Sequence, residues 1–260
     1  MSHWQRYASR WSQIAPPLRP TEEIVRFTQS NVGDAQARVL LLGVTPELAD
    51  AFEHVHAIDK SSQMIATVWP GDTATKRAVM ADWLDTMEPA SHYDAVIGDG
   101  SLNNVQFPRE LKALFLNVAR VMKPGGRFCC RLFERPERAI TEDDLRKVAR
   151  GGSGHGFHAF KWQLAMHLTA RVGANLPVAL ILQVFNDMFA DRDALAAETG
   201  WPRAAIDTID VYRGSPVVYA FPDRKEFRSA LPDAVTQVKF VACGSYDLAP
   251  LCPMLTFVKA

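Results

Sequence analysis

The chain has 260 residues, 48% of them hydrophobic, which is enough to bury a substantial core as one domain with an insertion. Lys plus Arg and Asp plus Glu number 29 each, and this zero net charge gives no electrostatic sign of a nucleic-acid partner. No stretch approaches the roughly 18 apolar residues of a membrane span, and no apolar run follows the N-terminus, so we expect neither a membrane anchor nor a signal peptide.

The N-terminal segment, residues 1–34, is predicted to be helical. Trp4, Tyr7 and Trp11 recur at the spacing of one helix face, and the prolines of residues 16–20 must end that helix before a second one begins. Such an aromatic stripe more often packs against a core than contacts a ligand. The functional alternative is a flap that closes over a cofactor.

A short apolar run at residues 39–42 organises the rest of the chain. It is too short for a helix and predicts a strand buried on both faces, as the first strand of a parallel sheet should be. Gly43 permits a tight turn, Thr45 is placed to cap a helix, and Pro46 suits its first position. A doubly wound α/β domain places such a strand, turn and helix start beneath its cofactor.

Three further strands are predicted to end on or next to an acid. They span residues 54–59 with Asp59 last, 76–83 with Asp82 and Trp83 last, and 93–101 with Asp99 between two glycines. An acid at the tip of the second strand is where α/β dinucleotide-type sites bind ribose hydroxyls. We therefore favour a binding role for Asp59 over a merely solvated one.

The remaining elements complete a sheet and add an insertion. An amphipathic helix over 107–122 stops at Lys123-Pro124-Gly125-Gly126, and a fifth strand spans 127–133. The predicted fold is therefore α/β, with a core over residues 35–136. Residues 137–215 read as a helical insertion with no strands. Residues 216–260 add a helix and two antiparallel strands, which makes a doubly wound, mostly parallel seven-stranded sheet with an antiparallel edge strand.

The cysteines and histidines point to no metal or disulfide site. Cys129 and Cys130 are adjacent on a predicted strand and face opposite sides, so reduced thiols in a cytoplasmic protein are the favoured interpretation. His155, His158 and His167 have no carboxylate at ligand spacing, so we expect no metal.

The ordered series of strand ends resembles the class I S-adenosylmethionine (SAM) dependent methyltransferases. The matching pieces are Leu40-Leu41-Leu42-Gly43, Ala57-Ile58-Asp59-Lys60-Ser61, Ala81-Asp82-Trp83, residues 93–100, and the helix end Arg120-Val121-Met122-Lys123-Pro124-Gly125-Gly126. The last of these is the most specific, and together they cover about residues 35–135. The resemblance implies a methyltransferase that uses SAM.

The resemblance also implies roles for particular positions. The loop from Gly43 to Glu47 would hold the methionine end of SAM, Asp59 its ribose, and Asp82 with Trp83 its adenine. The segment beginning at Asp99 would border the sulfonium. The full set of expected cofactor contacts is Gly43, Val44, Thr45, Glu47, Asp59, Lys60, Met64, Asp82, Trp83, Asp99, Gly100 and Ser101.

The first loop departs from the family pattern. Relatives carry two or three glycines there, whereas Val44-Thr45-Pro46-Glu47 stands in this chain. A pyrophosphate would be poorly served by this loop, whereas SAM has no phosphate and is cationic at sulfur. The alternatives are a SAM-binding protein without catalysis and an aminopropyltransferase-like enzyme on the same fold.

The methyl acceptor is the least determined part. Asp99 is the candidate general base, and an orienting role for it is equally consistent with the sequence. The insertion carries Phe157, Phe160, Trp162 and Met166 and is apolar enough to form a lid. We therefore expect a small-molecule acceptor enclosed between Asp99, the N-terminal aromatic helix and the insertion, with no nucleic-acid or membrane partner.

Overall fold

The computed structural model describes residues 2–138, 140–151 and 156–260. Its centre is a seven-stranded sheet in the order β3-β2-β1-β4-β5-β9-β8. The bounds of its strands are β1 Arg38–Leu42, β2 His54–Asp59, β3 Lys76–Met80, β4 Tyr93–Asp99, β5 Met122–Arg131, β8 Val235–Val241 and β9 Met254–Lys259. The first five strands are parallel to one another, and β9 runs antiparallel to both β5 and β8. The predicted α/β sheet with an antiparallel pair at one edge is thus confirmed.

The inner strands are buried on both faces, as their apolar runs predict. Val39 and Leu41 of β1 pack into one core cluster, and Leu40 and Leu42 pack into the cluster on the opposite face. Cys129 and its neighbour on β5 divide between the two clusters in the same way, and all four cysteines of the chain are free. Successive side chains of a strand point to opposite faces of the sheet, and both faces of this sheet are covered, which accounts for the arrangement.

Helices cover both faces of this sheet. Residues of α2 (Glu22–Val32), α3 (Pro46–Asp50) and α4 (Ser62–Val68) join the first cluster, and residues of α5 (Arg109–Val121) and α11 (Arg224–Ala230) join the second. Thr45 is the residue before α3 and Pro46 is its first residue, as the sequence indicated. This places the β1–α3 turn at the carboxyl end of the sheet.

Three elements differ from the expected bounds. β3 ends at Met80, so Asp82 and Trp83 lie in the turn that follows rather than on the strand. β5 already begins at Met122, because the Lys-Pro-Gly-Gly stretch continues its pairing with β4 across a register shift. The insertion, where we expected no strands, contains β6 (Asn175–Pro177), which pairs with β7 (Val218–Ala220) just beyond the expected end of the insertion at residue 215.

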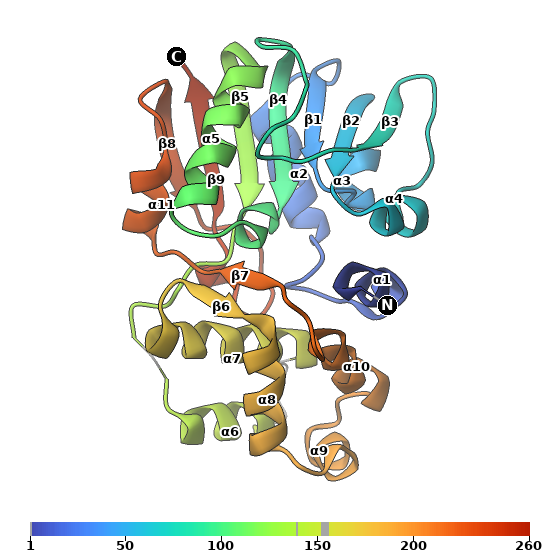
Figure 1. Ribbon diagram of the computed structural model, residues 1–260, viewed down its shortest axis with the longest axis vertical. Coiled ribbons are helices and arrows are strands. Elements are labelled where there is room, and N and C mark those ends of the chain that lie inside the picture. The colour runs from blue at the N-terminus through green and yellow to red at the C-terminus, as the bar shows by residue number, and fades with distance from the viewer. Residues whose placement is uncertain (1, 139, 152–155) are drawn as a thin grey trace.

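The insertion lies beyond the carboxyl ends of the parallel strands, below the sheet in Figure 1. Its helices are α6 Glu142–Arg150, α7 Phe157–Val172, α8 Val178–Met188, α9 Arg192–Thr199 and α10 Arg203–Asp207, followed by the 3₁₀ helix η3 Thr208–Tyr212. Phe157 and Phe160 of α7 pack on Trp201, with ring centroids 5.6 and 5.2 Å apart, and Phe185 completes this core. The insertion therefore has an aromatic core of its own.

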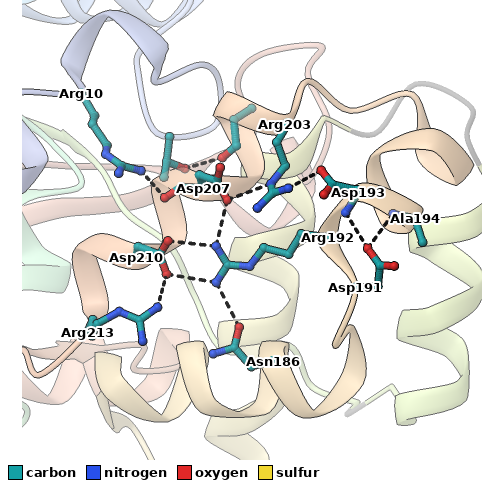
Figure 2. A network of polar contacts seen from close by, with 12 residues as sticks. Arg10, Asn186, Asp191, Arg192, Asp193, Ala194, Arg203, Asp207, Asp210 and Arg213 are labelled. Atoms are coloured by element: carbon teal, nitrogen blue, oxygen red, sulfur yellow. Dashed lines mark hydrogen bonds and ion pairs between the residues drawn. The ribbon is translucent and has the colours of Figure 1, made fainter.

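A polar network ties the end of the insertion together (Figure 2). Arg192 donates to Asp207 and Asp210, each at 2.9 Å, and Arg213 donates to Asp210 at 2.8 Å. Arg10, which comes from the N-terminal segment, donates to the backbone carbonyl of Asp207. The network thus joins α9, α10 and η3 and also holds the N-terminal segment.

The N-terminal segment lies between the insertion and the sheet domain (Figure 1). It contains α1 (His3–Ala8), η1 (Trp11–Gln13) and the prolines after them, so the predicted single helix is broken before Trp11. Arg6 donates to the carbonyls of Val211 and Arg213 at 3.0 Å, and α1 also contacts α4 of the core. In the part of the chain that the structure describes, no helix is long and apolar enough to cross a membrane.

Candidate active site

A half-enclosed cavity of about 180 Å³ opens at the carboxyl ends of β1, β2 and β4, where open α/β sheets bind ligands. Ten of the twelve expected cofactor residues line it: Gly43, Val44, Thr45, Asp59, Lys60, Met64, Trp83, Asp99, Gly100 and Ser101. The remaining two, Glu47 and Asp82, are not among the lining residues. The cavity thus brings the turns after three strands together in one space.

Glu47 and Asp82 lie in ion pairs instead. Glu47 accepts from Arg19 Nε at 2.7 Å, and its second oxygen, Oε2, is buried without a hydrogen-bond partner among the described residues. Asp82 pairs with Lys60, whose Nζ lies 2.9 Å from Asp82 Oδ2, and its side chain is 43% exposed. Lys60 lines the cavity, so this pair stands at its border.

Gly43, Asp59 and Trp83 surround one part of the cavity. A Cβ at Gly43 would lie 3.8 Å from the Trp83 ring and 3.9 Å from Asp59 Oδ2, so a side chain longer than alanine would enter the space between them. The Trp83 indole is fixed because its Nε1–H donates to the carbonyl of Ile58 at 2.7 Å. A flat ring beside a carboxylate is a fitting arrangement for an adenosine group.

The carboxyl of Asp59 is largely desolvated. Burial raises its pKa to about 6, and a hydrogen bond from the Ser61 backbone N–H, at 2.8 Å, opposes that rise. A buried carboxylate with only one donor retains unused acceptor capacity. Two ribose hydroxyls would supply the missing donors, so the residues present fit SAM.

The turn after β4 is packed tightly against β1. A Cβ at Gly98 would lie 2.6 Å from Ser101 Oγ, and one at Gly100, where φ is +67°, would lie 2.9 Å from the Phe133 ring. Ser101 Oγ in turn donates to the carbonyl of Leu42 at 2.6 Å. Both glycines are therefore required for the turn that positions Asp99.

Asp99 is engaged by a residue that the sequence argument missed. Arg131 of β5 donates from Nε and Nη2 to the two oxygens of Asp99 at 2.6 and 2.8 Å, and both side chains are buried. Burial raises the pKa of Asp99, and the Arg131 charge opposes that rise. Both oxygens of the candidate general base are occupied. The signal for Arg131 was a single cation within the otherwise apolar residues 128–133.

Asn103 is a second missed residue. Its Nδ2 donates to the carbonyls of Phe133 and Ala220 at 2.7 and 2.6 Å, and its Oδ1 accepts from the Phe133 N–H at 2.9 Å. It thereby joins the turn after β4 to the segment after β5 and to β7, the strand that pairs with β6 of the insertion. Only the tertiary structure reveals this role, because an Asn in a turn has many ordinary uses.

The outer wall of the cavity is aromatic. Trp4, Tyr7 and Trp11 line it from the N-terminal segment, which places them where the flap alternative required. Trp162 of α7 lines it from the insertion, beside Tyr219 of β7. Phe157, Phe160 and Met166, which we expected in the lid, are not among the lining residues, because α7 directs the two phenylalanines into the core of the insertion.

Histidines take structural positions in this region. His158 Nε2 lies 2.8 Å from the carbonyl of Gln13, and His3 Nδ1 lies 3.1 Å from Ser215 Oγ. His155 falls outside the described residues. Over the described ranges, no group of three or more His, Cys, Asp or Glu residues is arranged to hold a metal ion.

One family model matches part of the chain. Residues 43–130 match the family model described as a methyltransferase domain. The matched segment contains β2, β3 and β4 together with the turns that line the cavity. A comparison with curated proteins finds no match.

Solved structures share the fold at low sequence identity. A putative Zn-dependent alcohol dehydrogenase from Rhodobacter sphaeroides is 15% identical, with a TM-score of 0.58 and 98% of each chain covered. A SAM-dependent methyltransferase from Methanosarcina mazei is 16% identical, with a TM-score of 0.51 and coverage of 93% of this chain and 99% of that one. A chain of the complex between the Haloferax volcanii Trm112 methyltransferase activator and a putative methyltransferase is 12% identical, with a TM-score of 0.53 and coverage of 100% and 98%.

Likeness at these identities shows the fold alone, so neither the zinc of the first neighbour nor the partner of the third carries over. The family match and the fold agree with the motif series in the sequence. Residues 43–130 thus match a methyltransferase domain, and the fold is the α/β fold shared with the SAM-dependent methyltransferase among these neighbours.

Proposed function

We propose that the protein transfers a methyl group from SAM to a small molecule held in the cavity between the sheet, the N-terminal segment and the insertion. The observation that supports this is the composition of the cavity wall. The expected cofactor residues form its inner part, and aromatic side chains from two separate segments close its outer part. Such a wall encloses a small acceptor, whereas a protein or nucleic-acid acceptor calls for an open, charged surface.

The inner wall suggests how SAM is held. Asp59 would accept from the ribose hydroxyls, and Trp83 would lie against the adenine, with the Lys60–Asp82 pair at the border. The methionine end of SAM would lie against Gly43, Val44 and Thr45, which line the cavity, while Arg19 holds Glu47 outside the lining.

The chain's own residues have to align two molecules and exclude water. SAM, when bound, supplies a methyl group on a sulfonium, which is transferred by in-line displacement. Asp99 is proposed to orient the turn after β4 rather than to remove a proton, since Arg131 holds both of its oxygens. Enclosure by Trp4, Tyr7 and Trp162 would exclude water from the reacting groups.

Two measurements test this function. Titration calorimetry should show that SAM and S-adenosylhomocysteine bind, and Asp59→Ala should weaken both about tenfold or more, because two ribose hydroxyls lose their acceptor. Release of S-adenosylhomocysteine in the presence of a small-molecule panel should then show turnover. Binding without turnover of any small molecule would favour a non-catalytic SAM-binding protein. The four free cysteines support a cytoplasmic location as part of this proposal.

A further inference from the structure

Three of the residues that line the cavity each carry a buried polar atom without a hydrogen-bond partner. Among the described residues that line the cavity, they are Trp11 Nε1, Asn104 Oδ1 and Trp162 Nε1. Each comes from a different part of the molecule: the N-terminal segment, the turn after β4 and the insertion. An unpaired buried polar group costs about 1–3 kcal/mol, which a ligand that pairs with it restores.

The amide of Asn104 has a defined orientation. Its Nδ2 donates to the carbonyl of Gly100 at 3.0 Å, which leaves Oδ1 as the unpaired atom. Asn104 lies five residues beyond Asp99, in the turn proposed to border the sulfonium. Asn104 Oδ1 is therefore an acceptor atom close to the reacting end of the cavity.

Among the described residues, none offers an unpaired charge at the acceptor end of the cavity. The charged residues that line the cavity are Asp59 at the ribose end, Lys60 paired with Asp82, and Asp99 held by Arg131. A charged acceptor would lose its hydration there without gaining a partner, which is costly. The electrostatics favour a neutral acceptor.

Aromatic residues line the acceptor end of the cavity. The Trp162 ring centroid lies 5.2 Å from those of Phe133 and Tyr219, edge-on to Tyr219 and tilted to Phe133. These rings come from α7, from the segment after β5 and from β7, and all three are buried. Packed rings of this kind present a surface suited to a flat aromatic molecule.

We propose that the methyl acceptor is a neutral aromatic amine that donates an N–H to Asn104 Oδ1 and carries a carbonyl-type oxygen that accepts from Trp162 Nε1–H. This inference rests on the proposed function and specifies its acceptor. Trp162 thereby makes the insertion the specificity-determining part of the molecule. Trp11 Nε1–H supplies a second donor from the N-terminal segment.

An amine fits the site better than a hydroxyl because it needs no general base. The amine nitrogen forms the new N–CH₃ bond with its lone pair, the S–CH₃ bond breaks, and its electron pair stays on sulfur. The methylated nitrogen then loses its proton to water. A neutral hydroxyl would have to lose its proton before or during attack, and Arg131 already occupies the nearest carboxylate, Asp99.

Three probes of similar shape test the acceptor's charge. They are 4-aminobenzamide, 4-aminobenzoate and 4-(aminomethyl)aniline, which share an aniline and carry a neutral, an anionic and a cationic substituent. Binding of each is measured by calorimetry on the full chain saturated with S-adenosylhomocysteine. We expect 4-aminobenzamide to bind at least fivefold more tightly than either charged probe. Equal or tighter binding of a charged probe, or no binding of 4-aminobenzamide at millimolar concentration, would overturn the inference.

The first titration separates this inference from the function on which it rests. If S-adenosylhomocysteine itself does not bind, the proposed function fails and the acceptor assignment fails with it. If it binds and a charged probe is preferred, only the acceptor assignment fails.

Variants then test the two contacts. Trp162→Phe keeps a ring but removes the N–H, so 4-aminobenzamide should bind about tenfold more weakly while S-adenosylhomocysteine binds as before. Asn104→Asp keeps an acceptor oxygen and adds a negative charge, so the preference should shift toward the cationic probe. Trp69→Phe is the matched control, because the Trp69 N–H is paired with Asp72 outside the cavity, and it should change neither affinity. An unchanged probe preference in both cavity variants would contradict the assigned contacts.

Discussion

Arg131 donates two hydrogen bonds to Asp99, at 2.6 and 2.8 Å, and the side chains are 0% and 4% exposed. This pair links β4 to β5 directly beneath the cavity. The Arg131 guanidinium also lies over the rings of Phe133 and Tyr246, at 5.4 and 5.2 Å. Asp99 is thus fixed as part of the cavity wall.

Breaking this pair should be costly. Asp99→Asn leaves the Arg131 charge buried without its partner, so we expect a loss of about 3–5 kcal/mol in the free energy of unfolding. Urea unfolding of the purified variant measures it. Arg26→Ala, which breaks the exposed Arg26–Glu22 pair, is the control and should cost under about 1 kcal/mol. Similar effects of the two changes would refute the importance assigned to the buried pair.

Asp59 should link cofactor affinity to pH. Its pKa in the folded protein without cofactor is about 6, and hydroxyl donors favour the ionised form. Affinity for S-adenosylhomocysteine should therefore fall as the pH drops from 7 to 5, and calorimetry in matched buffers checks this. An affinity that stays constant over this range would argue against Asp59 as the ribose acceptor.

Asp59 should lower the stability of the protein without cofactor while it strengthens cofactor binding. Because burial raises its pKa, the folded state binds more protons than the unfolded state between about pH 4 and 6, and ionised Asp59 destabilises the protein above that range. Asp59→Asn should thus stabilise the protein without cofactor at pH 8, by up to about 3 kcal/mol, while weakening cofactor binding. Thermal unfolding with and without S-adenosylhomocysteine measures both effects, and a destabilised variant would contradict the account.

Lys161 of α7 should make the protein more stable at alkaline pH. It is fully buried, its Nζ has no hydrogen-bond partner among the described residues, and burial lowers its pKa to about 7. The unfolded state binds the extra proton above pH 7, so stability should rise by about 3–4 kcal/mol between pH 7 and 10. Lys161→Met should raise stability at pH 7 and flatten this part of the profile. Urea unfolding midpoints between pH 7 and 10 measure both stabilities. If the stability of the variant rose with pH as steeply as that of the unchanged protein, the prediction would be wrong.

Gly98 should tolerate no side chain. A Cβ there would lie 2.6 Å from Ser101 Oγ and 3.1 Å from Cys130 Sγ, both in buried surroundings. Gly98→Ala should cost about 1–3 kcal/mol in the free energy of unfolding, through displacement of the turn after β4. Gly156→Ala is the control, since no atom lies within 4 Å of the added Cβ. If the two variants were equally stable, the turn after β4 could accommodate the added Cβ and the prediction would be wrong.

The sequence predicted the sheet well because its inner strands are buried on both faces. Runs such as residues 39–42 have no other stable arrangement than a covered strand, and the acids at the strand ends meet at one edge. The β6–β7 pair escaped prediction because each strand has three residues and Pro177 lies within one of them. Such short strands carry no period-two signal.

The site was predictable to the extent that it depends on strand ends. The position of Asp59 follows from where β2 stops, so the sequence alone placed it. Arg131 and Asn103 depend on which segments meet across the sheet and the insertion, and chain order does not determine this. Of the four residues expected in the lid, only Trp162 lines the cavity, because the sequence does not determine which face α7 turns toward the sheet.

A crystal structure of the protein with S-adenosylhomocysteine would test the central claim most directly. The account predicts adenine against Trp83, the ribose hydroxyls on Asp59, and the sulfur beside Asp99 and Gly100, facing the wall formed by Tyr7 and Trp162. Adenine bound elsewhere, or a ribose that makes no contact with Asp59, would contradict it.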